Sequence, residues 1–337
     1  MKSCFAGKRV IIIGAARQGI ALARFLAGQG AWVTLNDQRS ADQLATAQDS
    51  LAGVNVAWAL GGHPLDLLDQ ADMVCPSGGV PLTLPLVQEA RQRGILLSND
   101  SQIFLEMAPC NVIGITGSAG KTTTTTLVGR IAQTAIQSPN QAWVGGNIGR
   151  PLLLDVGEMQ PGDLAVMELS SFQLEIMTRA PQIAAVLNIT PNHLDRHETM
   201  EAYTRAKAQI LACQNPGDLA VLCREDPEAW RLRNLAQGQV WTFGRQLEPG
   251  HSGSYVAEGQ LWLWDGNQRA SVIALDQIEL RGEHNLLNVL AACAICAAAG
   301  LPISAMQSGI HGFRGVAGAV FVGGLGVDFF VFFAKVL

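Results

Sequence analysis

The residues best suited to chemistry stand in a threonine-rich stretch, ITGSAGKTTTTTL, at positions 115–127. Its order Gly-x-x-Gly-Lys-Thr, from Gly117 to Thr122, is shorter than the general phosphate-loop pattern G-x-x-x-x-G-K-[ST], which would need a glycine at Ile115. Backbone N–H groups at the helix start would bind phosphate, Lys121 would neutralise its charge, and the Thr122 hydroxyl would ligate Mg²⁺. The alternative interpretation is a glycine turn with an ordinary lysine.

Two apolar segments farther along the chain lead into side chains that suit a metal and phosphate centre. The segment LAVMEL, at 164–169, carries Glu168 near its end, and IAAVLNIT, at 183–190, leads to His193. If both are strands parallel to NVIGI at 111–115, their carboxyl ends converge. We therefore expect Glu168 and His193 to face the phosphate loop.

Lys207 lies on the apolar stripe of a predicted helix at residues 200–213. A buried ammonium is costly, so the ordinary interpretation is a side chain that snorkels to water. The alternative is a lysine that loses its charge by desolvation and reacts with CO₂ to give a carbamate, an anion able to bind metal. The other members of the stripe are Tyr203, Ala206, Ile210 and Leu211.

A polar group also marks the start of a predicted helix within residues 280–300. His284 and Asn285 stand together there, and Asn288 follows one turn later on the same side as Asn285. Helix capping is one interpretation of Asn285, and contact with a nucleotide is the other.

Two nucleotide-binding α/β units in series would position these groups. Residues 8–37 read as strand, glycine turn, helix and strand, the first βαβ of a doubly wound sheet. Ala16 takes the place of the middle glycine of a dinucleotide fingerprint, so this turn suits a NAD pyrophosphate less well. Asp37 ends the second strand, where it would accept hydrogen bonds from a ribose or uracil ring, or cap a turn.

A second glycine-rich turn, SGGVP at 77–81, precedes a helix. It would supply N–H groups to the crevice expected at the carboxyl ends of these strands, where Asp37 also lies. The strand and loop pattern then restarts close to Pro109. We therefore predict a Rossmann-like domain at 1–108, a P-loop-type ATPase domain with a mostly parallel sheet at 109–315, and a short anomalous segment at 316–337.

Bulk composition narrows the possible partners. The 337 residues are 48% hydrophobic and 15% charged, typical of a globular protein, and the net charge of −5 provides no general attraction to nucleic acid. The seven cysteines are an odd number in mostly apolar runs, which indicates reduced thiols in a cytoplasmic protein. Cys293-x-x-Cys296 lies in an alanine-rich run without a second ligand pair, so we interpret it as packing rather than as a metal site.

No targeting or membrane segment is predicted. The N-terminal apolar run is too short for a secretory signal. Residues 316–337 are apolar, but their glycines and the central Asp328 argue against stable insertion in a membrane.

Six stretches, in order and at consistent spacing from residue 8 to about 315, resemble the Mur ligase family of ATP-dependent, amide-forming enzymes of peptidoglycan synthesis. The short phosphate loop is the form found in that family, and the stretches from Glu168 and from Asn188 favour its D-glutamate-adding branch. The six stretches are GITGSAGKTTTT, VGGNIGRPLL, ELSSFQLE, LNITPNHLDRH, YTRAKAQI and GEHNLLNVLAA.

The resemblance implies a reaction in which ATP phosphorylates the carboxylate of UDP-N-acetylmuramoyl-L-alanine and the amine of D-glutamate attacks the acyl phosphate. It implies two Mg²⁺ ions, one held by Thr122 and Glu168 and one by His193 and a carbamylated Lys207. It thereby favours the carbamate over a snorkelling lysine. The implied catalytic residues are Lys121, Glu168, His193 and Lys207.

The resemblance also assigns the binding residues, in a cytoplasmic monomer. The ATP site comprises Gly117, Ser118, Ala119, Gly120, Lys121, Thr122, Thr123, His284 and Asn285. The site for the UDP-linked substrate comprises Arg17, Gln18, Asp37, Arg39, Ser77, Gly79, Asn147, Ser170 and Gln173.

Some positions depart from the family pattern. Gly78 stands where a proline is usual, and Asn192 where an aspartate is usual. The match ends at Val316, before the third domain that closes over ATP in the family. We therefore expect an incomplete sequence, and a chain of 337 residues that alone is a poor ligase.

Three other functions compete with a D-glutamate ligase. A folate-polyglutamate ligase would share the phosphate loop but lack a UDP-binding first domain. A binding module would keep both pockets without turnover. A P-loop GTPase has no support, because no guanine-reading motif is present.

Overall fold

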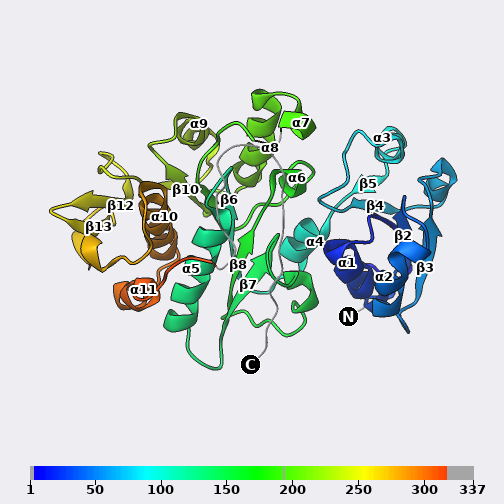
Figure 1. Cartoon of the computed structure of the whole chain (residues 1–337), viewed down its shortest axis with the longest axis horizontal. Coiled ribbons are helices and arrows are strands. Elements are labelled where there is room, and N and C mark those ends of the chain that lie inside the picture. The colour runs from blue at the N-terminus through cyan, green and yellow to red at the C-terminus, as the bar shows by residue number, and fades with distance from the viewer. Residues whose placement is uncertain (1–3, 193, 317–337) are drawn as a thin grey trace.

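The computed structural model describes residues 4–192 and 194–316, which form two α/β units built on separate sheets (Figure 1). The first sheet has the order β3-β2-β1-β4-β5, and all its strand pairs are parallel. The buried run Val10–Ile13 places β1 at its centre. Its strands are β1 Arg9–Ile13, β2 Trp32–Asp37, β3 Val56–Leu60, β4 Met73–Pro76 and β5 Leu96–Leu97.

Helices cover both faces of the first sheet, and one of them leads to the second unit. Helix α4 begins after Asn99, whose side chain accepts a hydrogen bond from the Gln102 N–H at 2.8 Å and so caps the helix. The helices are α1 Arg17–Gly28, α2 Ala45–Ser50, α3 Pro85–Gln92 and α4 Asp100–Met107, with short 3₁₀ turns at Asp42–Leu44 and Leu65–Leu68.

The second sheet has nine strands in the order β14-β13-β12-β11-β10-β9-β6-β8-β7. It is parallel from β7 to β12 and antiparallel at the β12–β13 and β13–β14 pairs. The strands are β6 Asn111–Thr116, β7 Ala142–Gly146, β8 Leu164–Glu168, β9 Ile183–Val186, β10 Leu219–Cys223, β11 Gln239–Phe243, β12 Ser252–Ala257, β13 Gln260–Trp264 and β14 Arg269–Ala274.

Helix α5 packs on β7 and β8, α10 packs on β10 to β12, and α8 contacts β6 and β9. Gly129 lets α5 approach the sheet, because a Cβ there would overlap the Val144 side chain. The helices are α5 Lys121–Ala135, α6 Ser171–Leu174, α7 Leu194–His197, α8 Met200–Ala212, α9 Pro227–Arg231, α10 Glu283–Ala298 and α11 Ile303–Ile310, with 3₁₀ turns at Leu152–Leu154, Leu232–Leu235 and Leu275–Gln277.

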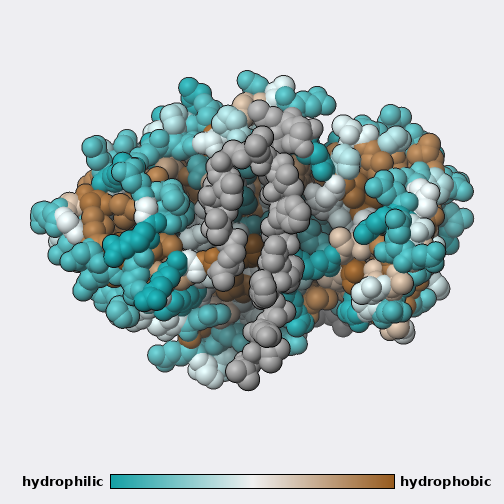
Figure 2. All heavy atoms as spheres, viewed as in Figure 1, coloured by the Kyte–Doolittle hydropathy of each residue, from teal (hydrophilic) through white to brown (hydrophobic). Residues whose placement is uncertain are grey.

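A continuous hydrophobic core joins the units, running from Val10 and Leu26 in the first to Val112 and Leu290 in the second. On the face shown in Figure 2, hydrophilic residues cover much of the outer surface of both units, and hydrophobic residues show in separate patches.

The strand pairings of the two sheets confirm the predicted α/β fold with a mostly parallel second sheet. The sheets change between Leu97 and Asn111, and the domain limits 1–108 and 109–315 stay predictions.

Two smaller expectations concern the cysteines and the membrane. Cys293 and Cys296 are fully buried in α10, and burial raises the pKa of Cys293 to about 12 and that of Cys296 further above its usual range, as expected for packing thiols. No helix within the described residues is both long and apolar enough to span a bilayer. The segment 317–337 lies outside those residues.

Candidate active site

The phosphate loop connects the end of β6 to the start of α5, and two of its glycines are required by geometry. Gly120 has a φ of +79°, and a Cβ there would overlap Oδ1 of Asn288. A Cβ at Gly117 would lie 2.9 Å from the Cβ of Leu187. Because side chains would clash at both positions, only glycine fits this backbone.

Asn188, which follows β9, fixes the phosphate loop through three hydrogen bonds. Its Oδ1 accepts a hydrogen bond from the Ala119 N–H at 2.8 Å, and its Nδ2 donates to the Ala119 carbonyl at 3.1 Å. Its own carbonyl accepts from the Ser118 N–H at 3.0 Å. No residue pattern marks Asn188 as part of this site, although it stands in the stretch LNITPNHLDRH.

Glu168 lies beside the loop because β8 and β9 flank β6, as expected. The Thr122 hydroxyl donates to Oε2 of Glu168 at 2.8 Å, and Nδ2 of Asn147 donates to its Oε1 at 2.9 Å. Glu168 is 2% exposed, so its carboxylate is held in place by both neighbours. A hydroxyl next to a carboxylate is a hard oxygen donor set, which fits Mg²⁺ bound jointly with substrate phosphates.

The described residues contain no group of three or more His, Cys, Asp and Glu side chains that would hold a metal unaided. His193, the predicted ligand of the second Mg²⁺, falls outside them. The metal roles of Thr122, Glu168, His193 and Lys207 therefore stay predictions.

One buried and one half-buried lysine, Lys207 and Lys121, donate to the same carbonyl of the phosphate loop. Nζ of Lys207 donates to the Gly117 carbonyl at 2.9 Å, and Nζ of Lys121 donates to the same oxygen at 3.0 Å. Lys207 is 1% exposed, so the snorkelling interpretation is wrong: α8 turns this side chain into the interior, with Nζ 4.7 Å from the centre of the Tyr203 ring.

Burial is the main electrostatic influence on both lysines. Desolvation lowers the pKa of Lys207 well below its usual range, the charge of Lys121 lowers it further, and Glu168 opposes the change. Desolvation also lowers the pKa of Lys121, again against the attraction of Glu168. The site thus favours a neutral amine at Lys207, the form that reacts with CO₂.

A cavity of about 970 Å³ opens in front of the loop and extends to the start of α10. It is lined by the predicted ATP-binding residues Ser118, Ala119, Gly120, Lys121, Thr122, Thr123, His284 and Asn285. Asn288, which the sequence placed beside Asn285, also lines it, as do residues that sequence reasoning missed, namely Cys223, Glu225, Asp226, Phe243 and Leu280. These lie in or after β10 and β11 and around the start of α10, with no local motif to mark them.

Capping is not the role of Asn285. Gly282 is the residue that precedes α10, and the Asn285 amide donates to the Arg281 carbonyl at 2.7 Å. Its Oδ1 accepts from Asn288 at 3.1 Å, so the two asparagines share one side of the helix as expected. Contact with a nucleotide stays a prediction.

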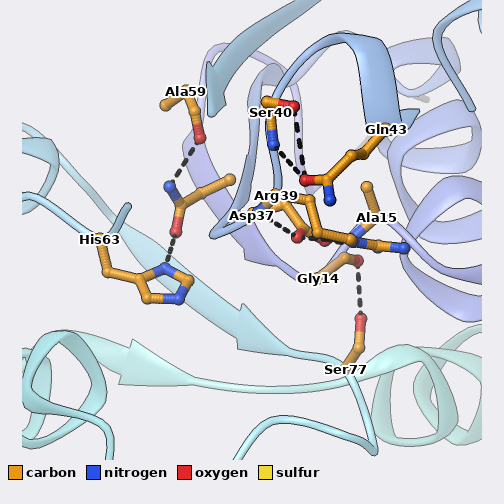
Figure 3. A network of polar contacts seen from close by, with 10 residues as sticks. Gly14, Ala15, Asp37, Arg39, Ser40, Gln43, Ala59, His63 and Ser77 are labelled. Carbon is orange, nitrogen blue, oxygen red and sulfur yellow. Dashed lines mark hydrogen bonds and ion pairs between the residues drawn. The ribbon is translucent and has the colours of Figure 1, made fainter. Parts of the chain in front are cut away.

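In the first unit, Asp37 stabilises the glycine turn (Figure 3). Its Oδ2 accepts from the Ala15 N–H at 2.8 Å, and its Oδ1 accepts from the Arg39 N–H at 3.0 Å. The Arg39 guanidinium also pairs with this carboxylate at 2.7 Å and is the main reason that the pKa of Asp37 is lowered. Turn capping is therefore realised, and a ribose or uracil contact stays a prediction.

Ser77 joins the two glycine turns, since its hydroxyl donates to the Gly14 carbonyl at 3.1 Å (Figure 3). A second pair nearby was not foreseen. Nδ1 of His63 lies 2.5 Å from Oδ1 of Asn36, whose amide donates to the Ala59 carbonyl at 2.7 Å. This pair fixes the carboxyl end of β2.

Five of the predicted substrate residues gather where the units meet. Arg17 donates to the Asn147 carbonyl at 2.9 Å, and Nε2 of Gln173 donates to the Ser101 hydroxyl at 2.7 Å. Ser170 and Gln173 form a capping box at the start of α6. Nε2 of Gln18 is buried and has no hydrogen-bond partner within the described part of the chain, so it is a donor that a ligand at this junction would satisfy.

Asp100 is a further group at the junction that sequence reasoning missed. Its side chain is buried, which raises its pKa to about 6 against the opposing hydrogen bond from Gln173. It follows Asn99, whose Nδ2 donates to the Gln173 carbonyl at 2.8 Å. Side chains of both units therefore form one polar network.

Family comparisons match both units. Residues 115–296 match the Mur ligase middle domain, and residues 8–98 match the Mur ligase MurD-like N-terminal domain. The chain is 39% identical over 310 residues to a UDP-N-acetylmuramoylalanine–D-glutamate ligase of Symbiobacterium thermophilum, covering 92% of this chain and 68% of the relative. It is 40% identical over 314 residues to the ligase of the same name from Pelotomaculum thermopropionicum, covering 93% and 68%.

Solved structures support the fold. A UDP-N-acetylmuramate:L-alanyl-gamma-D-glutamyl-meso-diaminopimelate ligase from Neisseria meningitides aligns with a TM-score of 0.60 at 18% identity, covering 92% of this chain and 99% of that one. A murein peptide ligase from Psychrobacter arcticus aligns with a TM-score of 0.56 at 17% identity, covering 92% and 69%.

Proposed function

The chain belongs to the Mur ligase family, and we propose that it is an ATP-dependent, ADP-forming ligase that joins D-glutamate to UDP-N-acetylmuramoyl-L-alanine. One observation carries the proposal most directly. Glu168 contacts Thr122 of the phosphate loop through one oxygen and Asn147 through the other, and the Asn147 carbonyl accepts from Arg17 of the first unit. The proposed phosphate site would therefore lie next to the unit that would hold the UDP-linked acid.

ATP would bind along the cavity with its phosphates at the loop. The N–H groups at the start of α5 and the ammonium of Lys121 would hold the phosphate oxygens. Thr122 and Glu168 would hold one Mg²⁺, which neutralises phosphate charge when bound. The base and ribose would extend toward His284 and Asn285.

The UDP-linked substrate would bind at the carboxyl edge of the first sheet and reach the junction. Asp37, Arg39, Ser77 and Gly79 would hold its uridine diphosphate part. A nearer set, at the junction, would hold the muramoyl-alanine part and comprises Arg17, Gln18, Asn147, Ser170 and Gln173.

Amide formation would then proceed in two steps. A carboxylate oxygen of the alanine attacks the γ-phosphorus, and ADP leaves. The amine of D-glutamate attacks the acyl carbon, phosphate leaves with the bonding electrons, and the nitrogen loses a proton. Lys121 would stabilise the negative charge that develops in both steps.

Lys207 is proposed to act as a carbamate. Its neutral amine would add to CO₂ with release of a proton, and the resulting anion would hold a second Mg²⁺ together with His193. The support is the burial of Lys207 beside the loop and the direction of its pKa change. We further propose a cytoplasmic monomer, in keeping with seven free cysteines.

Calorimetry with two ligands tests the proposal. UDP-N-acetylmuramoyl-L-alanine and a non-hydrolysable ATP analogue with Mg²⁺ should each bind the chain, and each should bind in the presence of the other. Thr122→Ala should weaken the Mg²⁺-dependent binding of the analogue. Thr126→Ala, on the same helix but outside the cavity that the loop lines, is the matched control. Mutual exclusion of the ligands, or equal effects of the two variants, would refute the assignment.

A further inference from the structure

A column of three aromatic side chains runs from the edge of the first unit to the phosphate loop. The Phe172 ring of α6 stacks on the His197 ring of α7 at 5.1 Å with an interplanar angle of 1°, and His197 contacts the Tyr203 ring of α8 at 5.1 Å. We call Phe172, His197 and Tyr203 the ring column. Their helices α6, α7 and α8 lie together at the upper centre of Figure 1.

The inner end of the ring column is bonded to the phosphate loop. The Tyr203 hydroxyl lies 3.0 Å from Oγ of Ser118, and Ser118 donates to the Thr190 carbonyl at 3.0 Å. Because a serine hydroxyl has one proton, Tyr203 must be the donor in its bond to Ser118. Tyr203 is 1% exposed, and its ring also faces Nζ of Lys207.

The outer end reaches the other unit. The guanidinium of Arg196 lies 4.8 Å above the centre of the Phe172 ring and donates to the Gly79 carbonyl at 3.0 Å. Gly79 belongs to the glycine-rich turn of the first unit, which Ser77 ties to the Gly14 carbonyl. Arg196 therefore connects the Gly79 turn of the first unit to the ring column.

The middle of the ring column is held firmly. His197 is 6% exposed, and its Nε2 lies 2.9 Å from Oγ of the buried Ser171. This bond sets the orientation of the imidazole, and the stack in turn sets that of Phe172. Closely packed side chains therefore connect the Gly79 turn to Ser118. Because packed interiors transmit strain, a shift of the turn would be passed on to Ser118.

We propose that Arg196 and Tyr203 are positioning residues that couple occupancy of the Gly79 turn to the geometry of the phosphate loop. The inference rests on the proposed function, because it assumes a nucleoside diphosphate at the turn and ATP at the loop. Neither residue needs to contact the reacting atoms. Binding of either ligand would fix one end of the path and favour the loop or turn conformation that binds the other.

UDP is the sharpest probe, since it lacks the muramoyl-alanine part that would reach toward ATP. We would measure the dissociation constant of a non-hydrolysable ATP analogue with Mg²⁺, with and without saturating UDP. A coupling of at least about fivefold is expected for the wild-type chain. Linkage requires that the analogue tighten UDP binding by the same factor, which provides an internal check.

Two single variants test the path from its two ends. Tyr203→Phe removes only the hydroxyl that bonds to Ser118, and Arg196→Ala removes the contact with Gly79. Each should bring the coupling to within about twofold of unity while both ligands still bind, and the double variant should lose no more than either single one. Arg205→Ala, at an exposed arginine of α8, should leave the coupling unchanged.

The outcomes separate the inference from the proposed function. Failure of the wild-type chain to bind UDP or the ATP analogue would overturn both. Binding of both without coupling, coupling that survives in Tyr203→Phe and Arg196→Ala, or equal loss in Arg205→Ala would overturn the coupling alone. Lys121→Ala should still bind UDP with the wild-type affinity. That result would confirm that UDP does not bind at the phosphate loop, and loss of UDP binding would overturn the coupling.

Discussion

Replacing Lys207 by methionine should leave the fold at least as stable while removing the proposed carbamate ligand. The substitution removes the hydrogen bond to the Gly117 carbonyl, a loss of about 1 kcal/mol. That oxygen keeps its bond from Lys121. The substitution also removes the desolvation penalty of a buried polar amine, which stabilises the folded chain by about 1–3 kcal/mol. We therefore expect Lys207→Met to be more stable by about 0–2 kcal/mol at neutral pH.

The stability difference between wild type and Lys207→Met should also depend on pH in a definite direction. Because the folded chain holds Lys207 with a lowered pKa, the unfolded chain binds more protons at all pH values between that pKa and the ordinary lysine value of about 10.4. Wild-type stability should therefore rise with pH across that window relative to Lys207→Met. Urea unfolding at several pH values measures the difference, with Lys8→Met, an exposed lysine, as the control.

Added bicarbonate completes the test. A carbamate formed only in the folded state would stabilise the wild-type chain and leave Lys207→Met unaffected. A variant less stable than wild type would contradict this prediction and show that Lys207 is a net stabilising ammonium. An equal response of both proteins to bicarbonate would refute the carbamate.

Three further substitutions test other parts of the site. Gly120→Ala should weaken binding of an ATP analogue at least tenfold by calorimetry, because of its clash at positive φ; Gly149→Ala, also at positive φ but in open space, should not. Asp37→Asn should lower stability at pH 7 by weakening the pair with Arg39; since the pKa of Asp37 is lowered, the wild-type advantage in urea unfolding should shrink below about pH 3.9. Asp100→Asn should be more stable than wild type at pH 8, and this gain should diminish as the pH falls below about 6, because burial raises the pKa of Asp100.

The parts of the site predicted from sequence are those set by strand order and loop geometry. Glu168 ends a strand next to β6, so its place beside Thr122 follows from the parallel sheet alone. Gly117 and Gly120 belong to a contiguous pattern whose backbone requirements are known. In such cases the local sequence and the topology are sufficient.

Contacts between distant segments escaped prediction. Asn188 and Asn288 reach the phosphate loop from the segment after β9 and from α10, and no spacing rule links them to Ala119 or Gly120. Lys207 was correctly placed on the apolar stripe of its helix. A helical pattern does not say, however, whether a long side chain turns outward to water or inward to a carbonyl. That choice depends on the partner that the fold supplies, here Gly117.

Detection of the amide product is the most direct test of the proposed ligase activity. The purified chain, at a concentration comparable to its substrates, would be incubated with Mg²⁺, ATP, UDP-N-acetylmuramoyl-L-alanine and D-glutamate, and the products identified by mass spectrometry. We predict slow turnover, as expected of a poor ligase, with one glutamyl residue added to the UDP-linked substrate for each ADP formed, with D-glutamate but not L-glutamate, and none with Glu168→Gln. ADP formation that is independent of the UDP-linked substrate, or product from Glu168→Gln at the wild-type level, would contradict the account.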